Sequence, residues 1–281
     1  MEKLAKHELK LKALEVRYGI VQSIFNAQSG HPGGSLSAAD LITFLYFREM
    51  NFDPAKPDDP GRDRFVLSKG HAAPALYAAL AVRGVFPMEE VLRLRKKDSR
   101  FQGHPDMKSV PGVDMSTGSL GQGVSAACGM ALALKGSGQR VYALLGDGEC
   151  AEGQVWEAAM LASHYKLSNL CAMVDVNGLQ IDGTTKEVMD SSPLDEKFRA
   201  FGWNVIYTDA HDFDSIEEGF RKAREVTDRP SVMICRSVKG KGVSFMENAV
   251  GWHGVAPKKE QYEAALAELD AAKEALERET V

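Results

Sequence analysis

The sequence predicts an α/β fold in three layers, with a mainly parallel sheet covered by helices on both faces. Two observations lead to this prediction. Short, uninterrupted apolar runs alternate with longer amphipathic stretches along the chain. Apolar runs of this kind are typical of strands buried on both faces, and their alternation with helices is typical of a parallel sheet. Glycine clusters follow several of the runs, where the carboxyl ends of parallel strands would place a ligand.

The expected elements follow in chain order. We expect an amphipathic helix over 3–27, a loop over 29–34 (SGHPGG), a second helix capped by Ser35 or Ser37, and a polar, proline-rich connection over 51–63. The predicted strands are 65–67, 141–145, 170–176, 205–207 and 232–235. The predicted helices are 73–83, 88–97, 122–135, 153–165, 194–201, 214–226 and 258–279. The run at 93–97 (RLRKK) is interpreted as a solvated helix face.

Composition narrows the class of protein. The 281 residues include 44% hydrophobic and 26% charged residues, which is close to the average of soluble proteins. We expect one domain over residues 1–281, with residues 258–281 as a C-terminal helical extension. The net charge of −5 gives no reason to expect nucleic acid, and no apolar run is long enough to cross a membrane. The four cysteines are widely spaced, and the N-terminus is charged, so we expect a cytoplasmic protein.

The most specific motif joins two strand ends. GDG at 146–148 follows one predicted strand, and an NG turn follows the next strand one crossover later. Asp147 and Asn177 should therefore lie at the same edge of the sheet, where their oxygens would suit Mg²⁺ or Ca²⁺. Because Mg²⁺ usually keeps phosphate oxygens as ligands, the pair predicts a diphosphate, which Gly148 would let the backbone approach. The alternative is that both motifs are simple turns, and the spacing favours the metal site.

Two further features point to an anionic, polar ligand. GSLGQG at 118–123 leads into an apolar helix and would offer free N–H groups to an anion. No strand precedes this loop, so it lacks the context of a dinucleotide-binding fold. Four of the seven histidines lie beside glycine in predicted loops, and imidazoles suit hydroxyl and phosphate contacts and proton transfer. These four are His31, His71, His104 and His253. His7 and His164 are interpreted as surface or structural residues, and His211 is left unassigned.

Together these motifs resemble the N-terminal, diphosphate-binding half of transketolases. The matching segments cover nearly the whole chain in order: SGHPGGSLS, RDRFVLSKGHAAPALYA, QGHPD, STGSLGQGVS, LLGDGECAEGQVWEA, VDVNGLQIDG and WHG. GDG followed about thirty residues later by Asn marks thiamine-diphosphate enzymes in general. SGHPGG, SKGHA and GSLGQG narrow the resemblance to transketolases. The resemblance implies the three-layer thiamine-diphosphate-binding fold.

The resemblance implies a role for each matching residue. The implied ligands of Mg²⁺ or Ca²⁺ are Asp147, Asn177 and the carbonyl of Leu179. The residues implied to contact thiamine diphosphate are His71, Gly118, Leu120, Gly148, Ile181 and His253. The residues implied to be catalytic are His31, His104, His253, Glu152 and Glu157. The histidines would contact substrate hydroxyls and move protons, and the two glutamates resemble those that link two active sites across a dimer. A simpler account of Glu152 and Glu157 is a favourable position at a helix start.

The implied activity is transfer of a two-carbon ketol unit from a ketose or ketose phosphate to an aldose or aldose phosphate, as in the pentose phosphate pathway. In this family a separate pyrimidine-binding domain supplies a glutamate for the cofactor and arginines for the sugar phosphate. We expect no such domain within these 281 residues. We therefore expect the N-terminal subunit of a split transketolase that is active only with a C-terminal subunit, in an α₂β₂ heterotetramer.

Three alternatives stay open at this point. One is the α subunit of a 2-oxoacid dehydrogenase, and another is a split synthase of a deoxysugar phosphate. A third is a noncatalytic diphosphate-binding module. The histidine motifs favour transketolase over the 2-oxoacid dehydrogenase, and the identity of the two sugars is left open.

Overall fold

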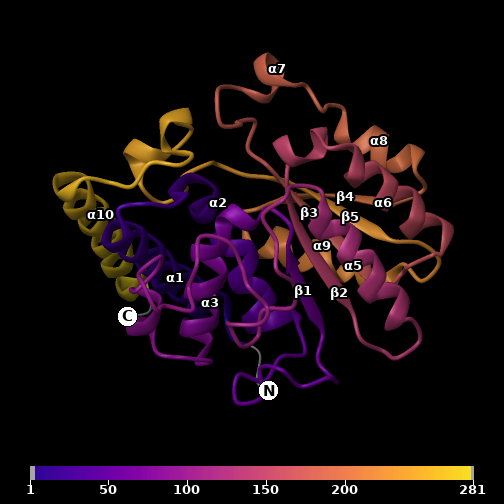
Figure 1. Cartoon of the computed structure of the whole chain (residues 1–281), viewed down its shortest axis with the longest axis horizontal. Coiled ribbons are helices and arrows are strands. Elements are labelled where there is room, and N and C mark those ends of the chain that lie inside the picture. The colour runs from indigo at the N-terminus through magenta and orange to yellow at the C-terminus, as the bar shows by residue number, and fades with distance from the viewer. Residues whose placement is uncertain (1–3, 280–281) are drawn as a thin grey trace.

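A five-stranded parallel sheet lies at the centre of the computed structural model, which describes residues 4–279 (Figure 1). The strand order is β1-β2-β3-β5-β4, and every neighbouring pair is parallel. The strands are β1 (Arg64–Leu67), β2 (Val141–Gly146), β3 (Leu170–Val176), β4 (Asn204–Asp209) and β5 (Ser231–Arg236). The predicted parallel sheet is therefore confirmed. Residues 3, 280 and 281 of the predicted terminal elements lie outside the described residues.

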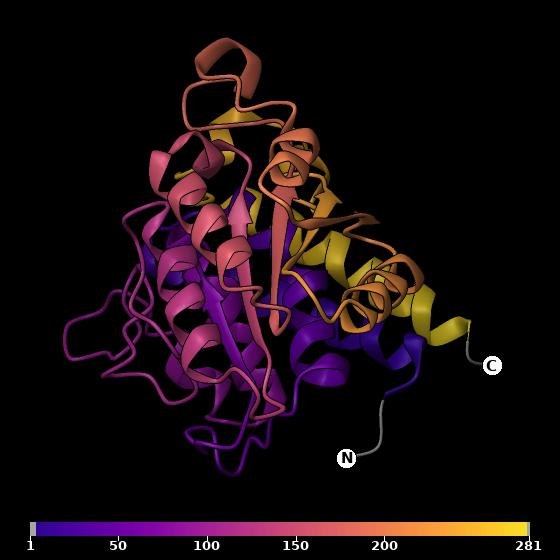
Figure 2. The same ribbon diagram turned by 90° about the vertical axis from the view of Figure 1, so that its right-hand side faces the viewer.

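Helices cover both faces of the sheet, as Figure 2 shows. They are α1 (Lys6–Ala27), α2 (Pro32–Phe44), α3 (Ala73–Arg83), α4 (Met88–Val91), α5 (Gln122–Ala133), α6 (Gly153–His164), α7 (Thr185–Val188), α8 (Leu194–Ala200), α9 (Phe213–Glu225) and α10 (Lys259–Arg278). Within residues 4–279, none of the helices combines the length and the apolar character needed to span a membrane.

Alternating strand residues build two separate cores. In β2, Tyr142 and Leu144 pack with residues of α1, α2, α3 and α9, whereas Val141, Ala143 and Leu145 pack with α5, α6 and α8. Successive side chains of a strand point to opposite faces, so one buried strand supplies both cores. This explains why the strands are continuously apolar and confirms the three-layer prediction.

The predicted C-terminal helix packs on the first helix of the chain. The rings of Phe25 in α1 and Tyr262 in α10 are stacked, with centroids 4.0 Å apart. Ala265 and Leu269 of α10 are fully buried in the core that α1 also lines. One side of this helix therefore covers part of the core.

The prediction of a loop over SGHPGG was wrong beyond His31. Helix α2 begins at Pro32, not after Ser35 or Ser37, because proline is well suited to the first position of a helix. The two glycines serve close packing instead of breaking the helix. A Cβ on Gly33 would lie 2.9 Å from the Trp252 carbonyl oxygen, and one on Gly34 would lie 3.1 Å from Nε2 of His71.

The helix predicted over 88–97 also differs. Helix α4 ends at Val91, and turns follow it. Arg95 and Asp98 have φ angles of 57° and 62°, in the left-handed region that a right-handed helix cannot contain. The basic run at 93–97 therefore does not form a helix face.

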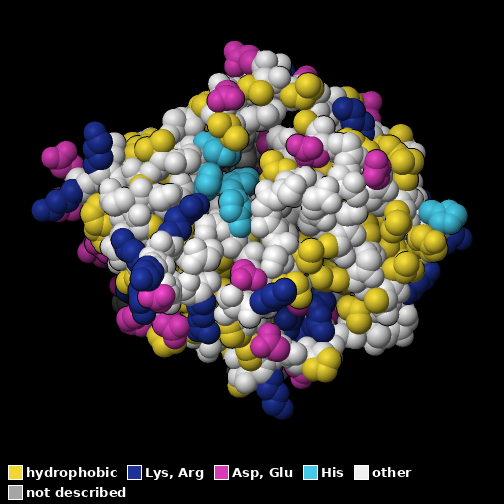
Figure 3. Space-filling view, viewed as in Figure 1, with side chains coloured by type: hydrophobic (Ala, Val, Ile, Leu, Met, Phe, Trp, Pro, Cys, Tyr) yellow, Lys and Arg dark blue, Asp and Glu magenta, His cyan; other side chains and the backbone are white. Residues whose placement is uncertain are grey.

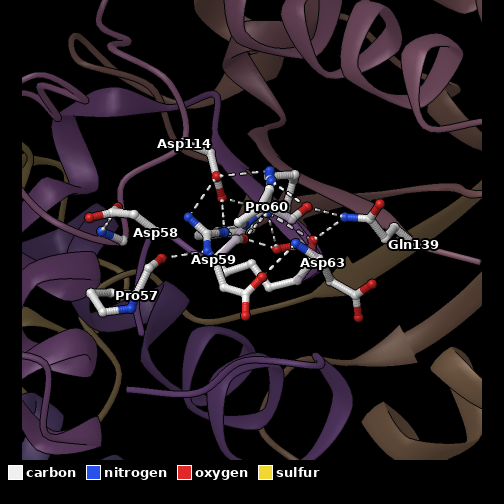
Figure 4. A network of polar contacts seen from close by, with 12 residues as sticks. Pro57, Asp58, Asp59, Pro60, Asp63, Asp114 and Gln139 are labelled. Carbon is white, nitrogen blue, oxygen red and sulfur yellow. Dashed lines mark hydrogen bonds and ion pairs between the residues drawn. The ribbon is translucent and has the colours of Figure 1, made fainter. Parts of the chain in front are cut away.

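The polar connection over 51–63 holds the amino ends of β1 and β2, at the sheet edge opposite the glycine clusters. Its buried Arg62 pairs with Asp114 at 2.9 Å, and Asp114 also accepts the N–H of Phe65 (Figure 4). Asp63 accepts the N–H of Arg140, at the residue just before β2. Charge-assisted hydrogen bonds to backbone therefore fix where these strands begin.

Gly123→Ala should destabilise the fold because the start of α5 lies against β1. A Cβ at this position would lie 2.6 Å from Cα of Ser68, and such overpacking costs about 1–3 kcal/mol. Gly129→Ala is the matched control in the same helix, since a Cβ there meets nothing within 4 Å. Urea unfolding should show a lower free energy of unfolding for the first variant. The control should gain about 0.5–1 kcal/mol. Equal effects of the two substitutions would contradict the packing argument.

Candidate functional site

One cavity of about 350 Å³ lies where the carboxyl ends of β1, β2, β3 and β5 meet. Figure 3 shows histidine side chains gathered in a hollow near the centre of this face. Every site residue predicted from the sequence lines this cavity except Glu157, which is exposed on α6. The lining residues among them are His31, His71, His104, Gly118, Leu120, Asp147, Gly148, Glu152, Asn177, Leu179, Ile181 and His253.

Parallel pairing explains how the two predicted oxygen donors come together. Gly146, the last residue of β2, pairs with Asp175 in β3. Asp147 and Asn177 therefore leave the sheet at neighbouring strand ends, and both side chains line the cavity.

Asp147 is a buried carboxylate that backbone N–H groups hold in place. Its Oδ1 accepts the N–H of Gly148 at 2.8 Å, and its Oδ2 accepts that of Gly178 at 2.6 Å. Burial, followed by the nearby charge of Asp175, raises the pKa of Asp147 to about 6. The raised pKa means that the surroundings compensate the buried charge poorly, and a bound cation would supply that compensation.

The donors at this end of the cavity fit a hard divalent cation. The Asp147 carboxylate, the Asn177 amide and the Leu179 backbone all line the cavity and all offer oxygen, which Mg²⁺ and Ca²⁺ require. Nζ of Lys239 donates a hydrogen bond to the Leu179 carbonyl oxygen at 3.3 Å, so a cationic group already lies beside that oxygen. Within residues 4–279, no cluster of three or more His, Cys, Asp or Glu side chains offers a different metal site.

The four loop histidines form one cluster. The ring centroid of His31 lies 5.3 Å from that of His71, 5.4 Å from that of His253 and 6.4 Å from that of His104. Burial, helped by neighbouring positive charges, lowers the pKa of His31 and of His253 to about 4. The pKa of His71 and of His104 is also lowered, again mainly by burial. At pH 7 each imidazole is therefore neutral, with one donor and one acceptor nitrogen for a polar ligand.

Lys239 links the histidines to the oxygen donors, and the sequence motifs did not identify it. Its Nζ lies 2.9 Å from Nδ1 of His253. An ammonium group can only donate, so Nδ1 is the acceptor and the imidazole proton lies on Nε2. Burial, together with the charge of Lys69, lowers the pKa of Lys239 to about 8, so it is mostly charged at pH 7. The feature of the sequence that could have identified Lys239 is its position shortly after the apolar run of a predicted strand.

A second lysine, also missed, lies beneath the cavity. Lys69 follows β1 and forms an ion pair with Asp175 of β3, and both side chains are buried. Lys69 also donates to the carbonyl of Gly34 at 2.9 Å, while the hydroxyls of Ser37 and Ser237 donate to Asp175. Burial raises the pKa of Asp175, but the charge of Lys69 and the hydrogen bonds from Lys69, Ser237 and Ser37 together outweigh burial and hold this pKa below its usual value. The pair therefore connects α2, β1, β3 and the segment after β5.

Glu149 holds the glycine-rich loop at 118–123 in place. This buried carboxylate accepts the N–H groups of Gly121 at 2.9 Å and of Gly146 at 3.1 Å, and the hydroxyl of Ser68. The N–H of Gly121 is thus used within the protein, which corrects the expectation that the whole loop offers free N–H groups. Gly118 and Leu120 still line the cavity.

The basic run at 93–97 contributes to the site electrostatically. Arg95 is exposed, and its charge is among the causes that lower the pKa of His31 and of His104. Its guanidinium lies against Gly103, where a Cβ would approach it to 2.2 Å. The interpretation of this run as a merely solvated face was therefore incomplete.

The site combines oxygen donors for a hard cation with neutral imidazoles and two lysines, at the carboxyl edge of a parallel sheet. This combination is typical of α/β domains that bind a diphosphate cofactor. A comparison with protein families gives a more specific assignment. The family described as "Transketolase, thiamine diphosphate binding domain" matches residues 10–275. The chain therefore belongs to the transketolase family, and its resemblance to the N-terminal half of these proteins is confirmed.

Two similar proteins carry names of transketolase subunits. The 6-deoxy-6-sulfo-D-fructose transketolase subunit of a Clostridium species is 44% identical over 265 residues, which are 94% of this chain and 96% of that protein. An apulose-4-phosphate transketolase subunit of Phocaeicola vulgatus is 41% identical over 273 residues, covering 96% of this chain and 97% of that protein.

Longer transketolases match along part of their length. The chain aligns with 42% of human transketolase at 40% identity, over 93% of its own length. The crystal structure of transketolase from Campylobacter jejuni superposes with a TM-score of 0.88 at 28% identity, covering 97% of this chain and 46% of that one. This likeness agrees with the parallel sheet and helices described above.

Acidification should destabilise the folded chain at pH values where its buried histidines are still neutral, because the same histidines are already protonated in the unfolded chain. The folded state keeps the pKa of His31 and of His253 near 4, below the value of a free histidine near 6.5. Between these values the unfolded chain binds more protons, so the free energy of unfolding should fall as the pH falls from 7 to about 4. Urea unfolding across this range, with NMR titration of ¹³C-labelled histidines, measures both quantities.

Lys239→Met should raise the pKa of His253, because it removes a positive charge and the donor to Nδ1. Lys241→Met is the matched control, since Lys241 lies two residues away and pairs with Glu247 instead. An unchanged His253 titration in Lys239→Met would show that Lys239 does not help to set this pKa.

Proposed function

We propose that the chain is the diphosphate-binding subunit of a split transketolase. With a C-terminal, pyrimidine-binding subunit in an α₂β₂ assembly, it would transfer a two-carbon ketol unit from a ketose to an aldose. The observation that supports this most is the cavity that brings the oxygen donors beside the histidine cluster. The subunit names of relatives that match along almost their whole length support the need for a partner.

The chain's own residues would hold the cofactor at two points. Asp147, Asn177 and the Leu179 carbonyl would bind Mg²⁺ or Ca²⁺, which in turn would bind the diphosphate. The Nε2–H of His253, fixed by Lys239, would donate a hydrogen bond to a ligand oxygen. Thiamine diphosphate supplies the carbanion chemistry that breaks and forms carbon–carbon bonds. By this proposal residues 1–281 form one binding domain, in a protein of the cytoplasm.

Neutral imidazoles fit the substrate side of this reaction. His31, His104 and His253 can each donate and accept a hydrogen bond at pH 7, which suits the hydroxyl groups of a sugar. Nδ1 of His31 is a buried nitrogen without a hydrogen-bond partner among the described residues, and a bound polar ligand would satisfy it. Glu152, at the cavity rim, and Glu157 on α6 would lie toward the second half of the assembly.

The names of the relatives suggest the class of sugar. One name includes a sulfonated fructose and the other a phosphorylated apulose, so each of the two named sugars carries a strongly acidic group. We propose a donor ketose with a terminal phosphate or sulfonate. Xylulose 5-phosphate and 6-deoxy-6-sulfofructose are the two donors to compare.

Reconstitution tests the proposed reaction. The purified chain should transfer no ketol unit alone with thiamine diphosphate and Mg²⁺, and should gain activity when a C-terminal transketolase subunit from the same source is added. Product formation from each donor and an aldose phosphate, measured by mass spectrometry, checks this. Full activity of the single chain would refute the split site. Decarboxylation of a 2-oxoacid by the pair would instead favour the dehydrogenase alternative.

Asp147→Ala should reduce the activity of the reconstituted pair by on the order of 100-fold and weaken binding of Mg²⁺ and thiamine diphosphate. The reason is the loss of the one carboxylate among the proposed cation ligands. Asp182→Ala is the matched control, because Asp182 is exposed on the loop that follows Ile181. Calorimetric titration of cofactor into the assembled pair, with and without Mg²⁺, separates lost binding from lost catalysis. Unchanged affinity in Asp147→Ala would exclude it as a ligand.

A further inference from the structure

His211 has no role in the proposed reaction, yet it occupies a defined place near the cavity. It lies in the turn between β4 and α9, where its backbone N–H donates to Asp209 at 3.0 Å. Its ring faces residues 238–242, which we call the lysine loop because Lys239 extends from it into the cavity.

The hydrogen bonds of the ring define its tautomer. Nε2 of His211 lies 2.9 Å from the backbone nitrogen of Val238, which can only donate. Nε2 must therefore be the acceptor, and the proton lies on Nδ1. Nδ1 lies 2.8 Å from Oδ2 of Asp40, so it donates to that carboxylate.

Asp40 is held by a second partner from α1. Arg17 donates to both of its oxygens, at 2.8 Å and 2.7 Å, in the two-pronged geometry that guanidinium and carboxylate favour. Both side chains are buried. Burial raises the pKa of Asp40, but the charges of Arg17 and His211 and their hydrogen bonds to the carboxylate together outweigh burial and keep this pKa low. The carboxylate is thus a fixed anchor for His211.

Arg17 also reaches the far end of the lysine loop. Its Nε donates to the carbonyl oxygen of Lys241 at 3.0 Å, and a Cβ on Gly242 would lie 2.8 Å from this nitrogen. Val238 and Lys241 are therefore both tied to one buried group of three side chains. Lys239 lies between the two tied points.

We propose that His211 is a positioning residue that, with Asp40 and Arg17, fixes the lysine loop so that Lys239 reaches both the Leu179 carbonyl and His253. The long side chain of Lys239 has several rotatable bonds, so its reach is precise only if its backbone is held. His211 supplies a tie near the N-terminal end of the loop and Arg17 one near its C-terminal end. They act together with two backbone hydrogen bonds, from Asn248 N–H to the Lys239 carbonyl and from Gly240 N–H to the Gly33 carbonyl. This role concerns the geometry of the cavity and does not depend on which reaction takes place there.

Three substitutions of His211 separate positioning from simple filling of space. His211→Phe keeps the ring volume and removes both hydrogen bonds. In His211→Asn, the shorter side chain should still donate to Asp40 but should not reach Val238. In His211→Gln, the longer side chain should place its amide oxygen within reach of the Val238 N–H. The readout is the titration midpoint of His253 in the full chain, followed by NMR with ¹³C-labelled histidine. It reports on Lys239 because the charge of Lys239 helps to lower the pKa of His253.

We expect the His253 midpoint to rise by about one pH unit in His211→Phe and in His211→Asn, as Lys239 leaves its partner. His211→Gln should restore the midpoint of the unmodified chain. Arg17→Lys, which cannot hold Asp40 and the Lys241 carbonyl together, should also raise the midpoint and gives an independent arm if His211→Phe does not fold. Phe220→Leu is the control for lost stability, since this buried side chain stacks on Phe44 in the core.

The proposal is overturned if His211→Asn or Arg17→Lys folds and leaves the His253 midpoint unchanged, or if Phe220→Leu shifts it equally. A second measurement rests on the proposed function. In the assembled pair, His211→Asn should weaken binding of thiamine diphosphate with Mg²⁺ by about 10-fold, and His211→Gln should not. If the unmodified pair fails to bind the cofactor, the proposed function is wrong, and the NMR result still decides the role of His211.

Discussion

The buried ion pair between Lys69 and Asp175 is the interaction on which the site depends. Taking both charges out of water is costly, and an unpaired partner left behind would be strongly destabilising. The pair persists because hydrogen bonds from Ser37 and Ser237, and one to the Gly34 carbonyl, satisfy its remaining polar atoms. These partners come from α2 and from the segment after β5, while Lys69 itself follows β1. One interaction therefore sets the distances between the segments that line the cavity.

Most strands and helices could be predicted from local sequence patterns, because these patterns depend on neighbouring residues and not on contacts between distant parts of the chain. Continuous apolar runs identified the strands, and the spacing of GDG and NG placed Asp147 beside Asn177. The errors arose where packing overrides local preference. Gly33 and Gly34 resemble a loop, but they are required where α2 approaches the Trp252 carbonyl and the ring of His71.

The site was predicted less completely than the fold, for a physical reason. Motifs identify residues whose type is unusual at its position, such as a histidine beside glycine. Lys69, Lys239 and Glu149 are common residue types, and their importance arises from burial and from partners distant in the sequence. Conversely, Glu157 belongs to a motif but lies outside the cavity in the single chain. Its proposed contact depends on a second subunit.

The two walls of the cavity differ in how freely they can vary. Every residue of α2, which begins directly after His31, is buried, so almost any substitution there changes a packed volume. Across the cavity, Ile181 is 63% exposed and belongs to a loop with few buried residues. Evolution or a designed library can therefore alter this second wall at small cost to stability. Changes in the shape of the cavity should therefore arise more readily from the Ile181 side than from the tightly packed α2 side.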